Sequence, residues 1–220
     1  IPEEIIIKAP KDIGTELQSL VGDQHKLNLA IRELLKYSLI RRDSSRHTIM
    51  MHRLVQAVLR NGMDKELQKE WAERAIRAVN WSFPDVKNVE EWPKCQQWIP
   101  HALVCAEFIE KWKLSFKDAA RLLNEAGYHL RDRAQYAEVE QLYERALAIK
   151  EEVQGEKHPD TALSLNNLGM LYHTQGKYAE AEPLFKRALT IYEEILGPTH
   201  PSTITVRNNY NYLLEQMKPE

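Results

Sequence analysis

The sequence predicts a mainly α protein with one small β-hairpin near its start and a solenoid of helix pairs in its second half. Three observations support this fold class. Residues 162–203 repeat residues 120–161 at a fixed offset of 42, with 19 of the 42 aligned positions identical. Apolar residues recur at helical spacing through most of the chain. Two short β-prone runs flank a polar turn, and both lie within residues 38–51.

The composition excludes several classes of protein. The chain has 220 residues, a formal net charge of −2 and 43% hydrophobic residues, so we expect no general attraction to nucleic acid or to an anionic membrane. No apolar run is long enough to cross a bilayer. Cys95 and Cys105 lack a CxxC spacing, which favours reduced thiols in the cytoplasm. Because the chain begins at Ile1 instead of Met, we expect a piece of a longer protein.

Residues 1–62 carry ten basic and seven acidic side chains, and they predict three short helices followed by a hairpin. The helices are expected around PEEIII, after Asp12 and after Asp23, where the aspartates are suitable N-caps. The runs SLIRR and HTIMM then flank the turn DSSR. Three helices followed by a hairpin is the element order of a winged-helix domain. A further helix is expected to begin at His52.

Residues 63–118 predict a helical linker or arm. Two helices are expected there, at 64–83 and 94–112, separated by Pro84 and the polar segment DVKNVEEWP. This arm would join the winged-helix domain to the repeats of residues 119–220.

Each repeat in residues 119–220 predicts two antiparallel helices, and the last copy is partial. In the second copy the helices are expected at 162–176 and 178–196. Small residues such as Gly169 and Ala188 stand where the two helices must approach closely. These intervals resemble the tetratricopeptide repeat. The 42-residue period, with its GxxHP connection, resembles the kinesin light chain subclass of that repeat.

The resemblance implies a groove that is lined by the first helix of each repeat and binds a protein or peptide partner. Asparagine recurs on this face with the 42-residue period, although it is a poor helix former. Its amide can pair with the backbone of an extended peptide, or it can link neighbouring repeats. The sequence leaves these two roles open. The residues expected along the groove are Arg121, Asn124, Tyr128, Arg131, Leu163, Asn166, Met170, His173, Thr205, Asn208 and Tyr212.

Enzyme motifs are missing from the sequence. The eight glycines form neither GxxxxGK nor GxGxxG, and the histidines form neither HExxH nor a Cys/His zinc spacing. We therefore expect no catalytic residue, no metal and no cofactor in this chain.

The string YSLIRRDSSRHTIMMHRLVQAVLR at 37–60 resembles the winged-helix segment of NB-ARC domains, in the STAND signalling ATPases that carry tetratricopeptide repeats. In that family a Met-His-Asp motif occupies the position of Met51, His52 and Arg53. The resemblance implies that His52 contacts the β-phosphate of ADP and helps to hold an inactive state, whereas Arg53 departs from the family's aspartate. The domain that binds ADP or ATP would lie upstream of Ile1 and would be a second partner of this chain. Alternatively, His52 caps the helix that follows it.

Two other functions fit the sequence. A winged helix can read DNA, and Arg41, Arg42, Arg46 and His47 cluster on the expected wing. The candidate recognition helix LNLAIRELLKYS is nearly balanced in charge, however, so we do not expect nucleic acid as the partner. The repeats can also act alone as a peptide-binding adaptor similar to kinesin light chain. The function predicted first is the regulatory, partner-sensing region of a STAND-type NTPase.

Overall fold

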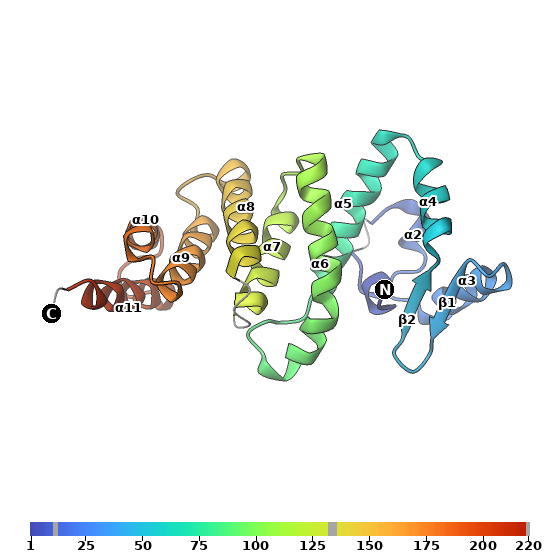
Figure 1. The fold of residues 1–220 in the computed structure, drawn as a ribbon, viewed down its shortest axis with the longest axis horizontal. Coiled ribbons are helices and arrows are strands. Elements are labelled where there is room, and N and C mark those ends of the chain that lie inside the picture. Colours follow the sequence, from blue (N-terminus) through green and yellow to red (C-terminus); the bar gives the residue numbers. More distant parts are fainter. Residues whose placement is uncertain (11–12, 132–135, 219–220) are drawn as a thin grey trace. The chain divides into compact units, whose positions relative to one another are not determined.

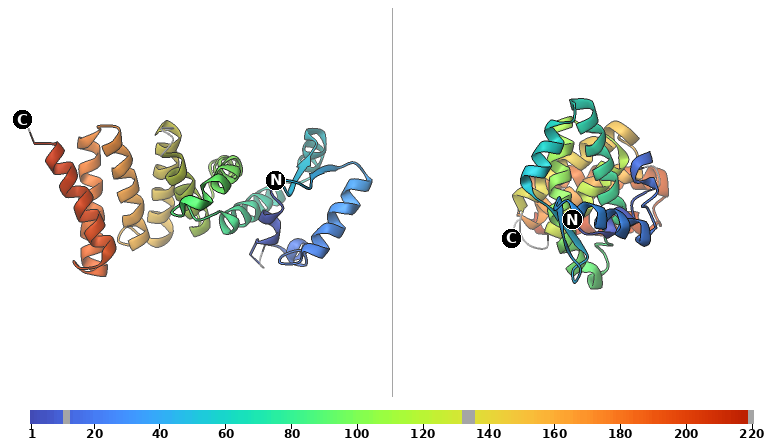
Figure 2. Two further views of the ribbon diagram at one scale, coloured as in Figure 1. Left: turned by 90° about the horizontal axis from the view of Figure 1, so that it is seen from below. Right: turned by 90° about the vertical axis from the view of Figure 1, so that its right-hand side faces the viewer.

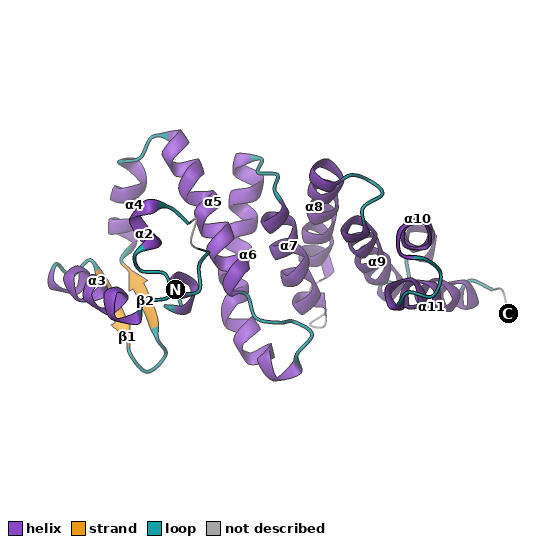
Figure 3. Cartoon of the chain, turned by 180° about the vertical axis from the view of Figure 1, so that it is seen from behind, coloured by secondary structure: helices purple, strands orange, loops and turns teal. Residues whose placement is uncertain are grey.

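The computed structural model describes residues 1–10, 13–131 and 136–218. The chain divides into two compact units, Ile1–Leu114 and Ser115–Glu220 (Figure 1). Within the described ranges the secondary structure is helical apart from one hairpin, drawn in orange in Figure 3. The mainly α fold class with a small hairpin and paired helices is therefore confirmed. No helix in these ranges is both long and apolar enough to span a membrane.

The first unit begins with three helices and a hairpin, in the order that the sequence predicts. Its elements are α1 (Glu4–Ile7), α2 (Thr15–Gln18), α3 (Gln24–Lys36), β1 (Ile40–Asp43) and β2 (Thr48–Met51). The two strands pair antiparallel, with Ile40 opposite Met51 and Asp43 opposite Thr48. The residues before α1 continue this pairing, because the Ile49 N–H donates to the carbonyl of Ile1 at 2.8 Å.

Local side-chain hydrogen bonds fix the ends of these elements. The carboxylate of Asp23 accepts from the backbone N–H of Lys26 and caps α3, as the sequence predicts. The Asp43 carboxylate accepts from the backbone N–H groups of Ser45 and Arg46 and closes the turn between the strands. The second predicted cap, Asp12, lies outside the described residues.

The small core of this region joins α3 to the hairpin. Leu27 and Ile31 are buried on one face of α3, and they pack with Ile40 of β1 and Ile49 of β2. The two α3 positions are four residues apart, so both point to the same side of the helix. Alternation places the two strand residues on the inner face of the hairpin. The hairpin thus acts as the second layer of this core.

The rest of the first unit is helical. It comprises α4 (Arg53–Asn61), α5 (Lys65–Ser82), the 3-10 helix η1 (Val89–Glu91) and α6 (Trp92–Trp112). In α6, the fully buried Trp98 donates from Nε1 to the hydroxyl of Ser82 at 3.1 Å, and this hydroxyl donates to the Ala78 carbonyl. Lys94 of α6 also pairs with Glu4 of α1 at 2.8 Å. Residues 63–114, expected as part of a separate arm, therefore pack within the first unit.

Across residues 115–131 and 136–218 the second unit holds five helices that lie side by side (Figure 2). They are α7 (Lys117–Arg131), α8 (Tyr136–Gln154), α9 (Pro159–Thr174), α10 (Tyr178–Leu196) and α11 (Pro201–Gln216). The helix predicted at 178–196 has the same bounds as α10. Within each repeat the first helix packs most closely against the second, α7 against α8 and α9 against α10.

Glycine permits the closest approach within each helix pair. A Cβ atom on Gly127 of α7 would lie 2.6 Å from Cε1 of Tyr143, and one on Gly169 of α9 would lie 3.0 Å from Cε1 of Phe185. Both rings are fully buried. The two contacts are 42 residues apart in the sequence, so in both repeats a glycine of the first helix makes room for an aromatic ring of the second.

The connections between repeats are also copies of each other. Nδ1 of His158 accepts from the backbone N–H of Asp160, and Nδ1 of His200 accepts from that of Ser202, so each histidine caps the next helix. In the same turns, the hydroxyls of Thr161 and Thr203 each donate to the carbonyl of the preceding turn glycine at 2.8 Å. The GxxHP motif is therefore a helix-capping turn.

Candidate functional site

His52 lies immediately before α4 in extended conformation, with φ −62° and ψ 140°. Its Nδ1 accepts a hydrogen bond from the backbone N–H of Leu54 at 3.2 Å. Because Nδ1 acts as an acceptor, the neutral ring carries its proton on Nε2. The side chain is exposed. The capping role left open by the sequence is therefore present, and it leaves Nε2–H as the donor that can reach a ligand.

The helix that follows His52 has an uncovered apolar face. None of the nine residues of α4, all of which the structure describes, is buried. Leu54 is 70% exposed and Val58 is 71% exposed, and they stand four residues apart on one side of the helix. Leu59 is half exposed beside them. These three side chains form the exposed aliphatic face of α4.

Two of the basic residues of the hairpin lie beside carboxylates. The guanidinium of Arg42 is turned inward and pairs with the Glu3 carboxylate, with Nε and Nη2 each 2.7 Å from a carboxylate oxygen. Glu3 is only 2% exposed, and its hydrogen bond with Arg42 lowers its carboxyl pKa. Arg46 faces Asp43 at 3.9 Å. On α3, the aliphatic residues Leu29, Leu34 and Leu35 are exposed.

The asparagines of the first helices have an inter-repeat role. The Asn124 Oδ1 atom accepts a hydrogen bond from Nδ2 of Asn167 at 2.9 Å, and Oδ1 of Asn166 accepts one from Nδ2 of Asn209 at 3.0 Å. Asn124 and Asn166 are buried, because neighbouring first helices pack over them. The expectation that these two amides face a peptide is thus corrected. Of the three predicted positions only Asn208 is exposed.

The donors Asn167 and Asn209 were not among the predicted residues. Their signal is present in the sequence as the doubled asparagine at 166–167 and 208–209, since a link between repeats needs both a donor and an acceptor. In the first repeat the equivalent pair of residues is Asn124 and Glu125. Asn124 is therefore the first amide in the series of links between repeats.

Two other rows with the 42-residue period stay accessible on the first helices. Arg121, Leu163 and Thr205 occupy one row, and all three are exposed. Tyr128, Met170 and Tyr212 occupy the other. Within this second row Tyr128 and Met170 are half-buried, whereas Tyr212 is 54% exposed. The side chains of these rows differ between repeats, which is the property that a selective partner surface needs.

His173 joins the second row through its ring. Its centroid lies 5.5 Å from that of Tyr178 and 5.2 Å from that of Tyr212, so the imidazole stacks with rings of α10 and α11. Its Nε2 atom is buried and has no hydrogen-bond partner among the residues that the structure describes. Arg131, at the equivalent position of the first repeat, lies over the ring of Tyr128 at 4.9 Å. The residues that were predicted to bind a partner therefore form two groups. Some are buried amides, and the others are accessible side chains or side chains in contact with aromatic rings.

The described residues hold no group of three His, Cys, Asp or Glu side chains that could bind a metal ion. Cys95 and Cys105 are buried in α6. Burial raises the pKa of the Cys105 thiol to about 12, so it stays protonated near neutral pH.

Comparison with known proteins agrees with the repeat architecture. Residues 118–194 and 173–218 match the tetratricopeptide repeat family, and residues 1–68 match a family described as a domain of unknown function, DUF7779. The crystal structure of BtubC (BKLC) from P. vanneervenii shares 18% sequence identity with a TM-score of 0.48, and the match covers 74% of this chain and 63% of that chain.

A nucleotide-binding leucine-rich repeat (NLR)-like protein of Hyaloscypha variabilis is 34% identical over 138 residues. The match covers 60% of this chain, and it spans 13% of the length of that relative. The second unit thus carries tetratricopeptide repeats, and 138 residues of the chain are similar to part of an NLR-like protein.

Proposed function

We propose that this chain is the regulatory and partner-sensing region of a STAND-type NTPase. In this proposal the first unit is a winged-helix domain that contributes His52 to an ADP-bound inactive state. The repeats bind a protein or peptide partner. The nucleotide, ADP or ATP, belongs to an NTPase domain of the longer protein, and the small share of the NLR-like relative that this chain spans supports such a longer protein.

The observation that carries the proposal is the geometry of His52. The cap hydrogen bond to Leu54 orients the imidazole and leaves the proton on Nε2. An N–H donor beside the first turn of a helix suits a phosphate oxygen, because the unpaired backbone N–H groups and the helix dipole also favour negative charge there. The side chain projects into solvent, where a second domain can reach it.

The exposed face of α4 supports contact with such a domain. Leu54 and Val58 would lose most of their exposed apolar surface on docking, and full burial of one aliphatic side chain contributes about 1.5–3 kcal/mol. The same docking would bring the upstream nucleotide site to His52, since Leu54 lies two residues after His52 in the first turn of α4. We infer that the NTPase domain covers this face in the inactive state.

Regulation would follow from coupling between the repeats and the nucleotide. A partner that binds the repeats and favours the open state must weaken ADP retention, and ADP must weaken partner binding by the same factor. A stand-alone adaptor, the alternative function, has no such coupling. Partner affinity that is equal with and without ADP would therefore favour the adaptor.

The experiment is a comparison of two histidine caps in the longer protein. His52→Ser keeps an N-cap oxygen but removes the imidazole. His200→Ser makes the same change at α11, where Nδ1 accepts from Ser202 at 3.2 Å. Bound ADP is measured by chromatography after purification, and its release is followed with a fluorescent ADP.

We expect faster ADP release by about ten-fold for His52→Ser, which corresponds to 1.4 kcal/mol. His200→Ser should release ADP at the wild-type rate. Equal release rates in all three proteins would show that His52 is a helix cap only. A purified longer protein that holds no ADP and binds none would contradict the assignment to the STAND class.

A further inference from the structure

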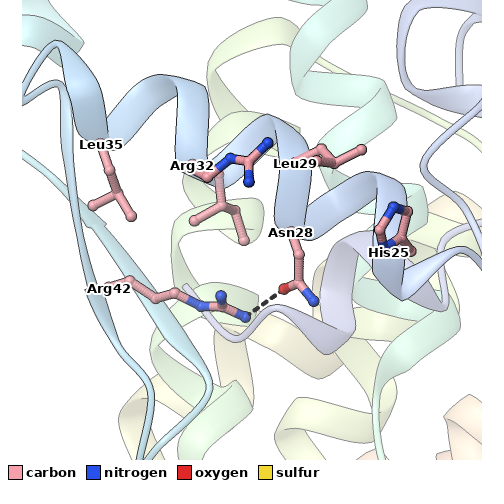
Figure 4. A pocket seen from close by; sticks show the side chains of 7 residues that line it. His25, Asn28, Leu29, Arg32, Leu35 and Arg42 are labelled. Carbon is pink, nitrogen blue, oxygen red and sulfur yellow. Dashed lines mark hydrogen bonds between the residues drawn. The ribbon is translucent and has the colours of Figure 1, made fainter.

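A groove lies between α3 and the β-hairpin, and His52 is not among the residues that line it. It encloses a cavity of about 360 Å³. Figure 4 shows that Asn28, Arg32 and Leu35 approach it from α3, whereas Arg42 reaches across from β1. The α3 residues are spaced by three or four positions, so they share one face of the helix. The sequence identifies α3 only as a candidate DNA recognition helix, and the nucleotide-sensing role does not involve this groove.

The floor of the groove is aliphatic. Ile31 is buried at its base and belongs to the core between α3 and the hairpin. Leu29 and Leu35 also line it, and both keep more than a third of their surface exposed. A concave site with apolar side chains below and a few polar groups at its edge is the usual form of a ligand pocket.

The polar edge of the groove carries two guanidinium groups, and one of them is held in place by a buried carboxylate. Arg42 is fixed by its two hydrogen bonds to the buried Glu3 carboxylate and by a third, from Nη2 to Oδ1 of Asn28 at 2.8 Å. Arg32 lies exposed at the opposite edge, near His25. Among the described side chains that line the cavity none is acidic. A guanidinium whose position is set before binding loses less side-chain entropy when it pairs with a carboxylate.

We propose that this groove binds an acidic, amphipathic peptide segment of another protein. One aliphatic or aromatic side chain of the segment fills the cavity over Ile31 and Leu35. Its flanking carboxylates pair with Arg32 and with the Nη1 edge of Arg42. The site is independent of the nucleotide-sensing role of His52, so the two proposals can fail separately.

A peptide fits the groove better than duplex DNA does. Affinity for DNA comes mainly from contacts of basic side chains with phosphates. On α3, the Lys36 ammonium is paired with the Glu33 carboxylate at 2.8 Å. The exposed Leu29 and Leu35 offer no phosphate contact. Apolar burial combined with two guanidinium groups is the recognition mode of an acidic helix.

The test uses the chain of residues 1–220 and three short fluorescein-labelled peptides. The first places Leu at i, i+3, i+4 and i+7 with Glu between them. The second replaces each Glu by Lys, and the third replaces each Leu by Ser. Fluorescence anisotropy gives the affinities. We expect the Leu/Glu peptide to bind at least about ten-fold more tightly than either control peptide.

Two adjacent leucines provide matched variants. Leu35 is 40% exposed and lines the groove, whereas Leu34 is 38% exposed and does not. Leu35→Glu should weaken binding of the Leu/Glu peptide by at least about ten-fold, and Leu34→Glu should leave it within about two-fold. Arg32→Glu, at an exposed edge position that folding does not need, should shift the preference toward the Lys peptide.

Several results would overturn the proposal. Equal loss of binding in Leu34→Glu and Leu35→Glu would indicate general stickiness of α3. No binding of the Leu/Glu peptide by the wild-type chain would leave the groove without the proposed ligand class. A duplex DNA titration in which binding depends on Arg32 and ignores Leu35 would assign the surface to nucleic acid instead.

Discussion

The two units of this protein are stabilised in different ways. In the repeats each device occurs twice, at the same offset of 42 residues: the glycine under an aromatic ring, the histidine cap, the threonine in the turn and the link between asparagines. In the first unit each important contact occurs once, as in the pair of Glu3 with Arg42 or of Trp98 with Ser82. A substitution in one repeat can therefore be compared with the same substitution in the other repeat, whereas each contact of the first unit must be tested separately.

The largest expected effect concerns the glycines that face aromatic rings. Gly127→Ala should destabilise the second unit by about 3 kcal/mol, and Gly169→Ala by about 1–2 kcal/mol, because overpacking costs this much and the first clash is tighter. Thermal and urea unfolding measure the two costs. The control is Gly62→Ala at the end of α4, where the nearest atom would be 3.4 Å away. Equal losses of stability in the two variants would show that the difference between the two approach distances does not affect the free energy of unfolding.

The next effect concerns the links between repeats. Asn167→Ala would leave Oδ1 of Asn124 buried without its donor, and we expect a loss of about 2 kcal/mol in the free energy of unfolding. Asn208→Ala, at the exposed position that corresponds to Asn124 and Asn166, should change stability by less than about 0.5 kcal/mol. Equal effects of the two variants would mean that burial of the amide does not matter.

A smaller effect is expected in the first unit, from Glu3→Gln. The substitution removes the charge that pairs with Arg42 and should cost about 1 kcal/mol at pH 7. Because the folded-state pKa of Glu3 is lowered below its usual 4.5, its contribution is present above that pH and is lost as pH falls through the lowered pKa. The stability difference between wild type and variant should therefore shrink in acid. A difference that is constant from pH 7 to pH 3 would contradict this account.

The smallest effect is expected where α4 is uncovered. Leu54→Ser removes an apolar side chain that is almost fully in water, so the stability of residues 1–220 should change by less than about 0.5 kcal/mol. In the longer protein the same variant should weaken the inactive state, because the docked face would lose apolar burial. A large loss of stability in the isolated chain would show that α4 packs within it.

Local features of this fold were well predicted by the sequence. The bounds of α10, the turn between the strands and the cap at Asp23 depend on residues a few positions apart, so the local pattern contains the needed information. The 42-residue period likewise predicted the helix pairs, since a repeat reports the same contacts more than once.

Contacts between distant elements were harder to predict. Whether Asn124 faces a partner or the next repeat depends on the rotation of one helix against another 43 residues later, which the pattern within a single helix does not contain. The numbers of basic and acidic residues in the first unit similarly do not indicate that Arg42 pairs with Glu3, which lies 39 residues earlier in the sequence. The groove beside α3 depends on that pairing, and for this reason it was absent from the sequence-based site.

The linked asparagines also limit how such an array can change length. Each donor stands 43 residues after its acceptor. One residue inserted into a first helix ahead of the donor would turn that donor by about 100° around the helix axis and break the link. Whole repeats of 42 residues, in contrast, can be duplicated, deleted or exchanged with every amide still opposite its partner. A graft of foreign repeats should therefore keep its stability only if it preserves both the period and the doubled asparagine.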